Sequence, residues 1–120
     1  MALLPSFRSP KRDVATDITR LSPILNSVQQ AARDAERELA GLRARLQESR
    51  DRAGFLFGDE VASQADANPK DKATLKDLEG FLSRGSIRQR YLERQVAAFA
   101  AISGILDEAI KPTTPIGRKV

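Results

Sequence analysis

Apolar residues recur in alternating steps of three and four along two long stretches of the chain. The first series, which we call the first seam, has eleven positions, of which ten are apolar. Its members are Ile18, Leu21, Leu25, Val28, Ala32, Ala35, Leu39, Leu42, Leu46, Ser49 and Ala53. A three-four repeat of this length is typical of a helix in coiled-coil-like packing. The spacing therefore predicts a long helix that buries this seam.

Capping signals set the predicted limits of this first helix. Ser22 followed by Pro23 favours a start at Ser22, because Ser is a good N-cap and proline fits the first helical turn. The alternative is a helix that begins earlier and kinks at Pro23. Basic residues followed by Gly54 are typical of a helix C-terminus. We expect a helix over about residues 22–53.

A second series, which we call the second seam, has eight apolar residues among eleven positions. Its members are Leu75, Leu78, Leu82, Gly85, Gln89, Leu92, Val96, Phe99, Ser103, Leu106 and Ile110. Asn68 and Pro69 form a good helix start, and Pro112 limits the other end. The helix is expected over about 69–111, either continuous or broken near Gly85, where the seam is weakest.

Two long amphipathic helices predict an all-α fold, an antiparallel helical hairpin with coiled-coil-like packing. Residues 13–111 would form the hairpin domain, with a connection over 54–68. The arms 1–12 and 112–120 each carry two prolines and are basic, so we expect them to be flexible. Folding the chain at the connection is expected to place the small residues Ala32 and Ala35 near the larger Ile87 and Tyr91.

Between residues 96 and 106 the second helix is apolar almost all round, whereas a helix in a lone hairpin needs one apolar stripe. We therefore expect a second copy or another helical protein to cover this segment, a homodimer being favoured because paired hairpins make a four-helix bundle. The candidate interface residues are Val96, Phe99, Ile102, Ile105, Leu106 and Ile110. Phe55, Leu56 and Phe57, beside the connection, either plug the end of the bundle or form a contact patch.

The formal net charge is +4, and the densest basic cluster consists of Arg84, Arg88, Arg90 and Arg94. Arginines at this density can contact phosphate, so the cluster and the basic arms are candidates for nucleic-acid binding. The alternative is that these side chains run along the edge of the hairpin and pair with acids of the other helix.

Composition argues against several kinds of chemistry. The chain has neither His nor Cys, so zinc sites, thiol chemistry and catalysis through His or Cys lack their usual residues. We expect no catalytic site, no cofactor and no metal. The uncharged stretch 95–106, which no other stretch of the chain exceeds in length, is too short to span a bilayer. The lack of Cys fits a reducing compartment such as the cytoplasm. The abundance of Ala and Arg is typical of proteins from GC-rich bacterial genomes.

These patterns lead to two hypotheses of function. The first is a non-enzymatic structural or adaptor protein that self-associates through helical packing and acts by protein–protein interaction in a larger assembly. The second is a basic accessory protein for DNA or RNA that uses residues 84–94 and the arms.

Overall fold

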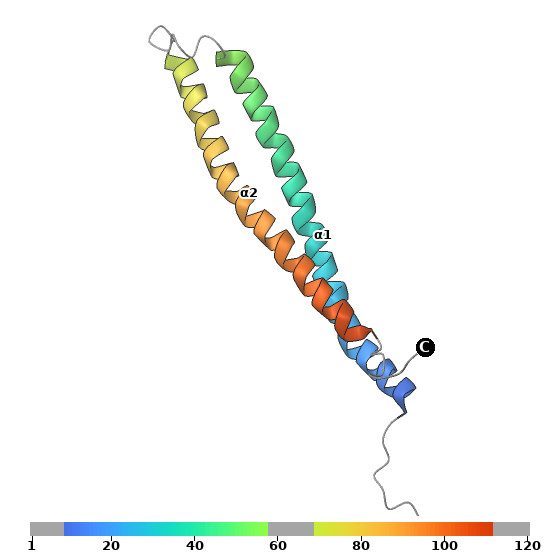
Figure 1. Cartoon of the computed structure of the whole chain (residues 1–120). Coiled ribbons are helices and arrows are strands. Elements are labelled where there is room, and N and C mark those ends of the chain that lie inside the picture. The colour runs from blue at the N-terminus through green and yellow to red at the C-terminus, as the bar shows by residue number, and fades with distance from the viewer. Residues whose placement is uncertain (1–8, 58–68, 112–120) are drawn as a thin grey trace, which may run out of the picture. The chain divides into compact units, whose positions relative to one another are not determined.

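The structure is a computed structural model that describes residues 9–57 and 69–111. It contains two helices, α1 (Pro10–Phe57) and α2 (Pro69–Ile110), and no strand among the described residues. The helices run antiparallel and pack side by side, which confirms the predicted helical hairpin (Figure 1). Residues 1–8 of the predicted N-terminal arm, the C-terminal arm and most of the predicted connection lie outside the described residues. The prediction of a flexible arm up to residue 12 is wrong for residues 10–12, which belong to α1.

Helix α1 begins at Pro10, so the predicted start at Ser22 is wrong. Ser9 caps the helix: its side-chain Oγ accepts a hydrogen bond from the backbone N–H of Arg12 at 3.2 Å, and its carbonyl accepts one from Asp13 at 3.0 Å. Pro10 occupies the first helical position, where its missing N–H costs nothing. Ser9 and Pro10 therefore form the helix start that the sequence pattern predicted at Ser22 and Pro23.

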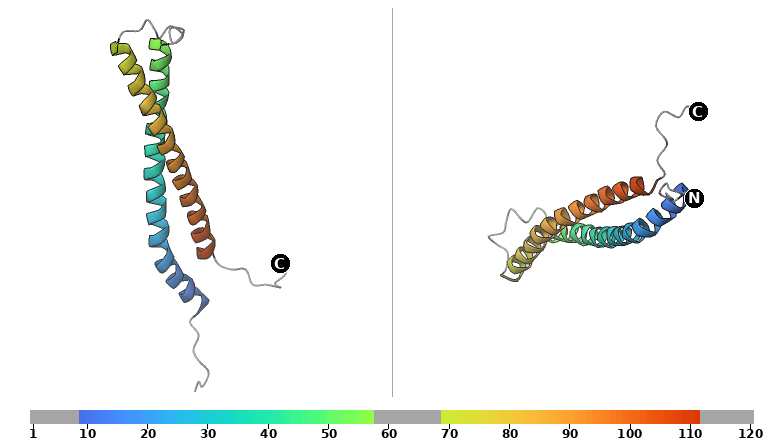
Figure 2. Two further views of the ribbon diagram at one scale, coloured as in Figure 1. Left: turned by 90° about the vertical axis from the view of Figure 1, so that its left-hand side faces the viewer. Right: turned by 90° about the horizontal axis from the view of Figure 1, so that it is seen from below.

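Pro23 lies inside α1, which agrees with the alternative prediction of a helix that begins earlier and contains this proline. Proline has no N–H to donate to the carbonyl four residues earlier, which here belongs to Thr19, and its ring crowds that carbonyl. A helix accommodates this by bending away from the proline. The N-terminal part of α1, drawn in blue, is visibly bent (Figure 2).

Helix α1 also continues through Gly54 to Phe57, beyond the predicted end at residue 53. A glycine that ends a helix adopts a left-handed backbone, and Gly54 has no such φ value. It is instead a helical residue, at a cost of about 1 kcal/mol relative to alanine. The predicted limits of the second helix agree with α2, which starts at Pro69 and is continuous through Gly85.

Burial follows the two predicted seams. All eleven positions of the second seam, on α2, are buried or half-buried, and so are ten positions of the first seam, on α1. The exception is Ile18, near the start of α1, which is 41% exposed. The three-four repeat therefore identified the buried side of both helices.

The described residues divide into two compact units, each with a segment of both helices. Unit 2 comprises residues 33–57 and 69–97, and unit 1 comprises 9–32 and 98–111. Every fully buried residue of the described chain belongs to unit 2. Its core consists of Leu39, Leu42, Leu46 and Leu92, with Phe81, Leu82 and Val96 packed against it. In unit 1 the seam residues are only half-buried.

The register of unit 2 is defined by Leu46, whose side chain sits directly on the backbone of Gly85. Because the helices are antiparallel, counting the same number of residues back from Leu46 on α1 and forward from Gly85 on α2 gives the residues that lie level. Leu39 is then level with Leu92, its partner in the core, and Ala35 is level with Val96. The expectation that Ala35 lies near Ile87 or Tyr91 is therefore wrong. Ile87 and Tyr91 are exposed and lie off the buried side of α2.

Candidate functional site

Two interhelical salt bridges flank the core of unit 2. Arg88 Nη2 lies 2.8 Å from Glu38 Oε2, and Arg43 Nη2 lies 3.2 Å from Glu93 Oε2. Each pair joins equivalent flanking positions of an antiparallel seam, one pair on each side. All four side chains are about half exposed, so each bridge contributes only about 0.2–1 kcal/mol. Their main effect is to favour this alignment of the helices.

The arginine cluster is thus divided. Arg88 pairs across the hairpin, as the edge-pairing alternative predicted. Arg84, Arg90 and Arg94 form no salt bridge within the described part of the chain. The Arg94 guanidinium lies 5.5 Å from the ring centroid of Tyr91, in cation–π geometry.

The three arginines without salt bridges accompany two exposed apolar side chains. Ile87 is 47% exposed and Tyr91 is 53% exposed. Together with Arg90 and Arg94 they line a shallow hollow on α2 in unit 2. The sequence analysis identified the charges of this surface but not its apolar members. The signal was present, because Ile87 and Tyr91 are four residues apart and lie off the seam.

The predicted interface residues fall into two groups. Val96, Phe99, Leu106 and Ile110 are half-buried at seam positions of α2. Ile102 and Ile105 are exposed, by 41% and 68%. The first group is therefore committed to the hairpin, and the second remains available to a partner.

The predicted tip contact involves the last turn of α1. Phe55 is 88% exposed, the highest value among the large apolar residues of the described chain. The side chains of Leu56 and Phe57 lie outside the described residues.

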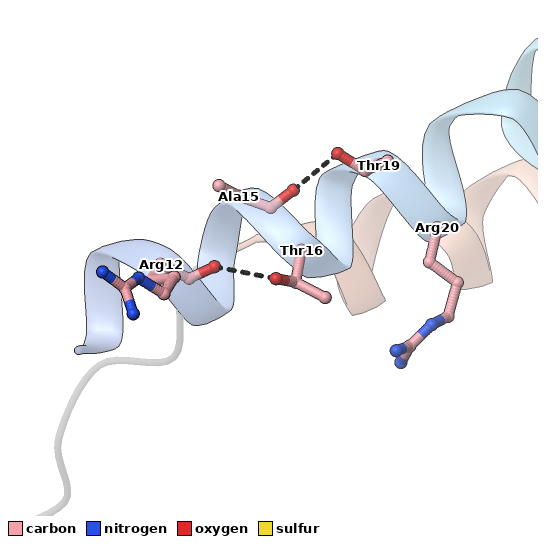
Figure 3. A pocket seen from close by; sticks show the side chains of 5 residues that line it. All are labelled: Arg12, Ala15, Thr16, Thr19 and Arg20. Atoms are coloured by element: carbon pink, nitrogen blue, oxygen red, sulfur yellow. Dashed lines mark hydrogen bonds between the residues drawn. The ribbon is translucent and has the colours of Figure 1, made fainter. Parts of the chain in front are cut away.

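A further hollow lies along α1 in unit 1 and was not predicted (Figure 3). It is lined by Arg12, Ala15, Thr16, Thr19 and Arg20. Both threonine hydroxyls donate to helix carbonyls, Thr16 to Arg12 at 3.0 Å and Thr19 to Ala15 at 2.9 Å. Each hydroxyl hydrogen is therefore engaged in a hydrogen bond within the helix. All five residues come from one helix, so the hollow is a surface feature of α1.

Ionisable groups are on the surface throughout the described residues, where no polar or charged side chain is buried. The pKa of Lys111 is raised by its hydrogen bond to Glu108, at 3.0 Å, and by the charges of Glu108 and Asp107. No cluster of acidic residues with metal-binding geometry is present in residues 9–57 and 69–111. Neither described helix has an apolar stretch of the length needed to cross a membrane.

Comparison of this chain with protein families, with curated proteins and with solved structures finds no match. The surfaces of α2 are therefore the basis for a functional proposal.

Proposed function

We propose that this chain is a non-enzymatic structural or adaptor protein that self-associates through helical packing and acts by protein–protein interaction in a larger assembly. The observation that carries the proposal is the exposure of Ile102 and Ile105 on a helix whose hairpin seam is already occupied. Burying a large aliphatic side chain contributes about 1.5–3 kcal/mol. A partner helix that covers both residues would gain this free energy.

The distribution of burial supports the same proposal. Unit 1 has no buried residue in its described part, although residues 98–106 of its α2 segment are almost entirely apolar. A two-helix seam in which no residue is buried contributes little stability, because most helical stability comes from packing of an apolar face. A second hairpin would supply the missing layer, as in a four-helix bundle.

The lack of cysteine is compatible with a reducing compartment. We propose that the protein acts in the cytoplasm.

The test is the absolute molar mass in solution, measured by light scattering after size exclusion over a dilution series. We expect a species of at least twice 13.2 kDa that dissociates on dilution. Ile105→Asp should shift it toward the monomer while circular dichroism shows an unchanged helix content. Ala44→Asp, at an exposed position of α1, is the matched control and should leave the mass unchanged. A wild-type monomer at every concentration would refute self-association.

A second candidate, a nucleic-acid-binding accessory protein, is favoured by Arg84, Arg90 and Arg94, which form no salt bridge within the described residues. Here affinity should fall steeply with salt, with a logarithmic slope of about −0.9 for each phosphate neutralised on duplex DNA. The variant Arg90→Ala/Arg94→Ala should reduce that slope by about two. Binding that is absent at low salt, or independent of salt, would exclude this candidate.

A further inference from the structure

Four exposed residues of α2 lie on one face of the helix in unit 2. They are Ile87, Arg90, Tyr91 and Arg94, which together line a shallow hollow. Their spacing places them on the same side of the helix over about two turns, or roughly 10 Å of its length. The whole face belongs to unit 2. We call it the Tyr91 patch.

The apolar members of the Tyr91 patch are not covered by the hairpin. Ile87 is 47% exposed and Tyr91 is 53% exposed, because both lie off the second seam. Residues four apart are neighbours on a helix surface, so the two side chains form one apolar area. Aromatic residues and arginine are the residue types enriched in protein–protein interfaces. The composition of the patch is therefore that of a contact surface for another protein.

The arginines of the Tyr91 patch have hydrogen-bond donors to offer. The Arg94 guanidinium lies 5.5 Å from the centroid of the Tyr91 ring. A cation–π contact uses none of the five N–H donors of a guanidinium. Arg90 and Arg94 form no salt bridge within the described part of the chain. The patch thus presents two positive charges directly beside its apolar area.

The charge around the Tyr91 patch determines which partner fits it. The one acidic residue between Arg84 and Arg94 is Glu93, whose Oε2 lies 3.2 Å from Arg43 Nη2 across the hairpin. Two copies of the patch placed face to face would bring arginines together, and such a contact of like charges is unfavourable. A partner with carboxylates is favoured instead, since carboxylates form strong bidentate pairs with arginine.

We propose that the Tyr91 patch is a docking site for an acidic segment of a partner protein, which places a large aliphatic side chain against Ile87 and Tyr91 and pairs its carboxylates with Arg90 and Arg94. The proposal names the partner class of the adaptor and rests on the proposed function for the existence of such a partner. Burial of the aliphatic side chain supplies affinity, and the charges supply orientation. A nucleic acid would gain little from Ile87, and a single tyrosine is a poor stacking platform.

Fluorescence anisotropy with the full chain tests the partner class. The labelled probes are an acidic peptide of glutamate with leucine at every third or fourth position, the same peptide with serine for leucine, and a single-stranded DNA. The leucine peptide should bind at low salt, and the serine peptide at least about tenfold more weakly. No binding of the leucine peptide, or equal binding of the serine peptide, would overturn the proposal. DNA binding that is tighter than peptide binding would assign the arginines to nucleic acid and would also overturn it.

A pair of isoleucine variants tests the apolar part of the Tyr91 patch. Ile87→Ala should weaken binding of the leucine peptide roughly fivefold and leave binding of the serine peptide unchanged. Ile24→Ala is the matched control, because Ile24 is 50% exposed on α1. It should leave both affinities unchanged. Equal losses in the two variants would contradict the assigned site.

A pair of double arginine variants tests the charged part. Arg90→Ala/Arg94→Ala should weaken binding of the leucine peptide roughly tenfold. Arg50→Ala/Arg52→Ala removes the same charge from exposed positions of α1 and should change the affinity by less than about twofold. Circular dichroism should show equal helix content in both variants. An equal effect of the two variants would show attraction by net charge alone and would overturn the site.

The molar mass of the same samples distinguishes failure of this proposal from failure of the proposed function. The Ile87→Ala variant should self-associate as the wild type does, because Ile102 and Ile105 carry the proposed self-association. A chain that self-associates but does not bind the leucine peptide retains the proposed function and loses the docking site. A monomeric chain that binds the peptide through the Tyr91 patch retains the docking site and loses self-association.

Discussion

Replacing Gly85 by alanine tests whether the hairpin depends on close approach of its helices. A Cβ added at Gly85 would overlap Leu46 Cδ2 and lie 3.2 Å from Leu46 Cγ, closer than carbon atoms normally pack. Leu46 is completely buried in the core of unit 2, so its side chain has little room to move aside.

Two opposing terms determine the size of the effect. Alanine favours a helix over glycine by about 1 kcal/mol, and overpacking a well-filled core costs about 1–3 kcal/mol, sometimes more. With Leu46 fully buried we expect the upper part of that range, and therefore a net loss of about 1–2 kcal/mol. At a urea m-value of about 1.5 kcal/mol per molar, the midpoint should fall by roughly 1 M.

Urea unfolding monitored by circular dichroism, at one fixed protein concentration, measures this change. Gly41→Ala and Gly104→Ala are matched controls, because each glycine is in a helix interior and a Cβ there would meet nothing within 4 Å. Both should raise stability by up to about 1 kcal/mol. Leu46→Ala should cost less in the Gly85→Ala background than in the wild type, with a coupling of at least about 0.5 kcal/mol. A Gly85→Ala protein as stable as its glycine controls would refute the reasoning.

Three further predictions concern the core, the salt bridges and the helix start. Leu92→Ala should destabilise the chain by about 2–5 kcal/mol in the same urea assay, whereas Ile24→Ala, at an exposed position of α1, should change stability by about 0.5 kcal/mol or less; equal effects would contradict the assigned core. A double-mutant cycle on Arg88 and Glu38 should give a coupling of about 0.2–1 kcal/mol that decreases with salt, and no coupling at low salt would show that the bridge contributes nothing. Ser9→Ala should lower helix content locally and cost about 1 kcal/mol, and unchanged amide exchange over the first turn would argue against the cap.

The buried sides of both helices could be predicted from the sequence because the three-four repeat reports directly on which residues face a partner helix. The helix limits could not. Pro23 and Gly54 are strong local signals for a boundary, yet glycine costs a helix only about 1 kcal/mol and proline about 3 kcal/mol. At Pro23 the seam continues on both sides, with Leu21 and Leu25 half-buried, and this packing offsets the cost. At Gly54 the seam has already ended at Ala53, and the helix continues to Phe57 despite the smaller cost of the glycine.

The same reasoning explains Gly85, where the sequence left two alternatives open. Read locally, a glycine between Arg84 and Ser86 indicates a weak point in the helix. In the hairpin it stands at a seam position, and its missing side chain is what admits Leu46. A glycine that falls in phase with an apolar repeat is thus evidence for close helix packing at that point.

The candidate surface was harder to predict because it depends on what the hairpin leaves uncovered. Helix α2 has apolar residues off its seam as well as on it, and the sequence analysis grouped both kinds in one interface. Once Gly85 and Leu92 are assigned to the interior, the faces separate. Phe99 and Leu106 then belong to the seam, and Ile105 belongs outside. The six residues first grouped as one interface are therefore two surfaces with different roles: one holds the hairpin together, and the other is the surface on which a second copy would act.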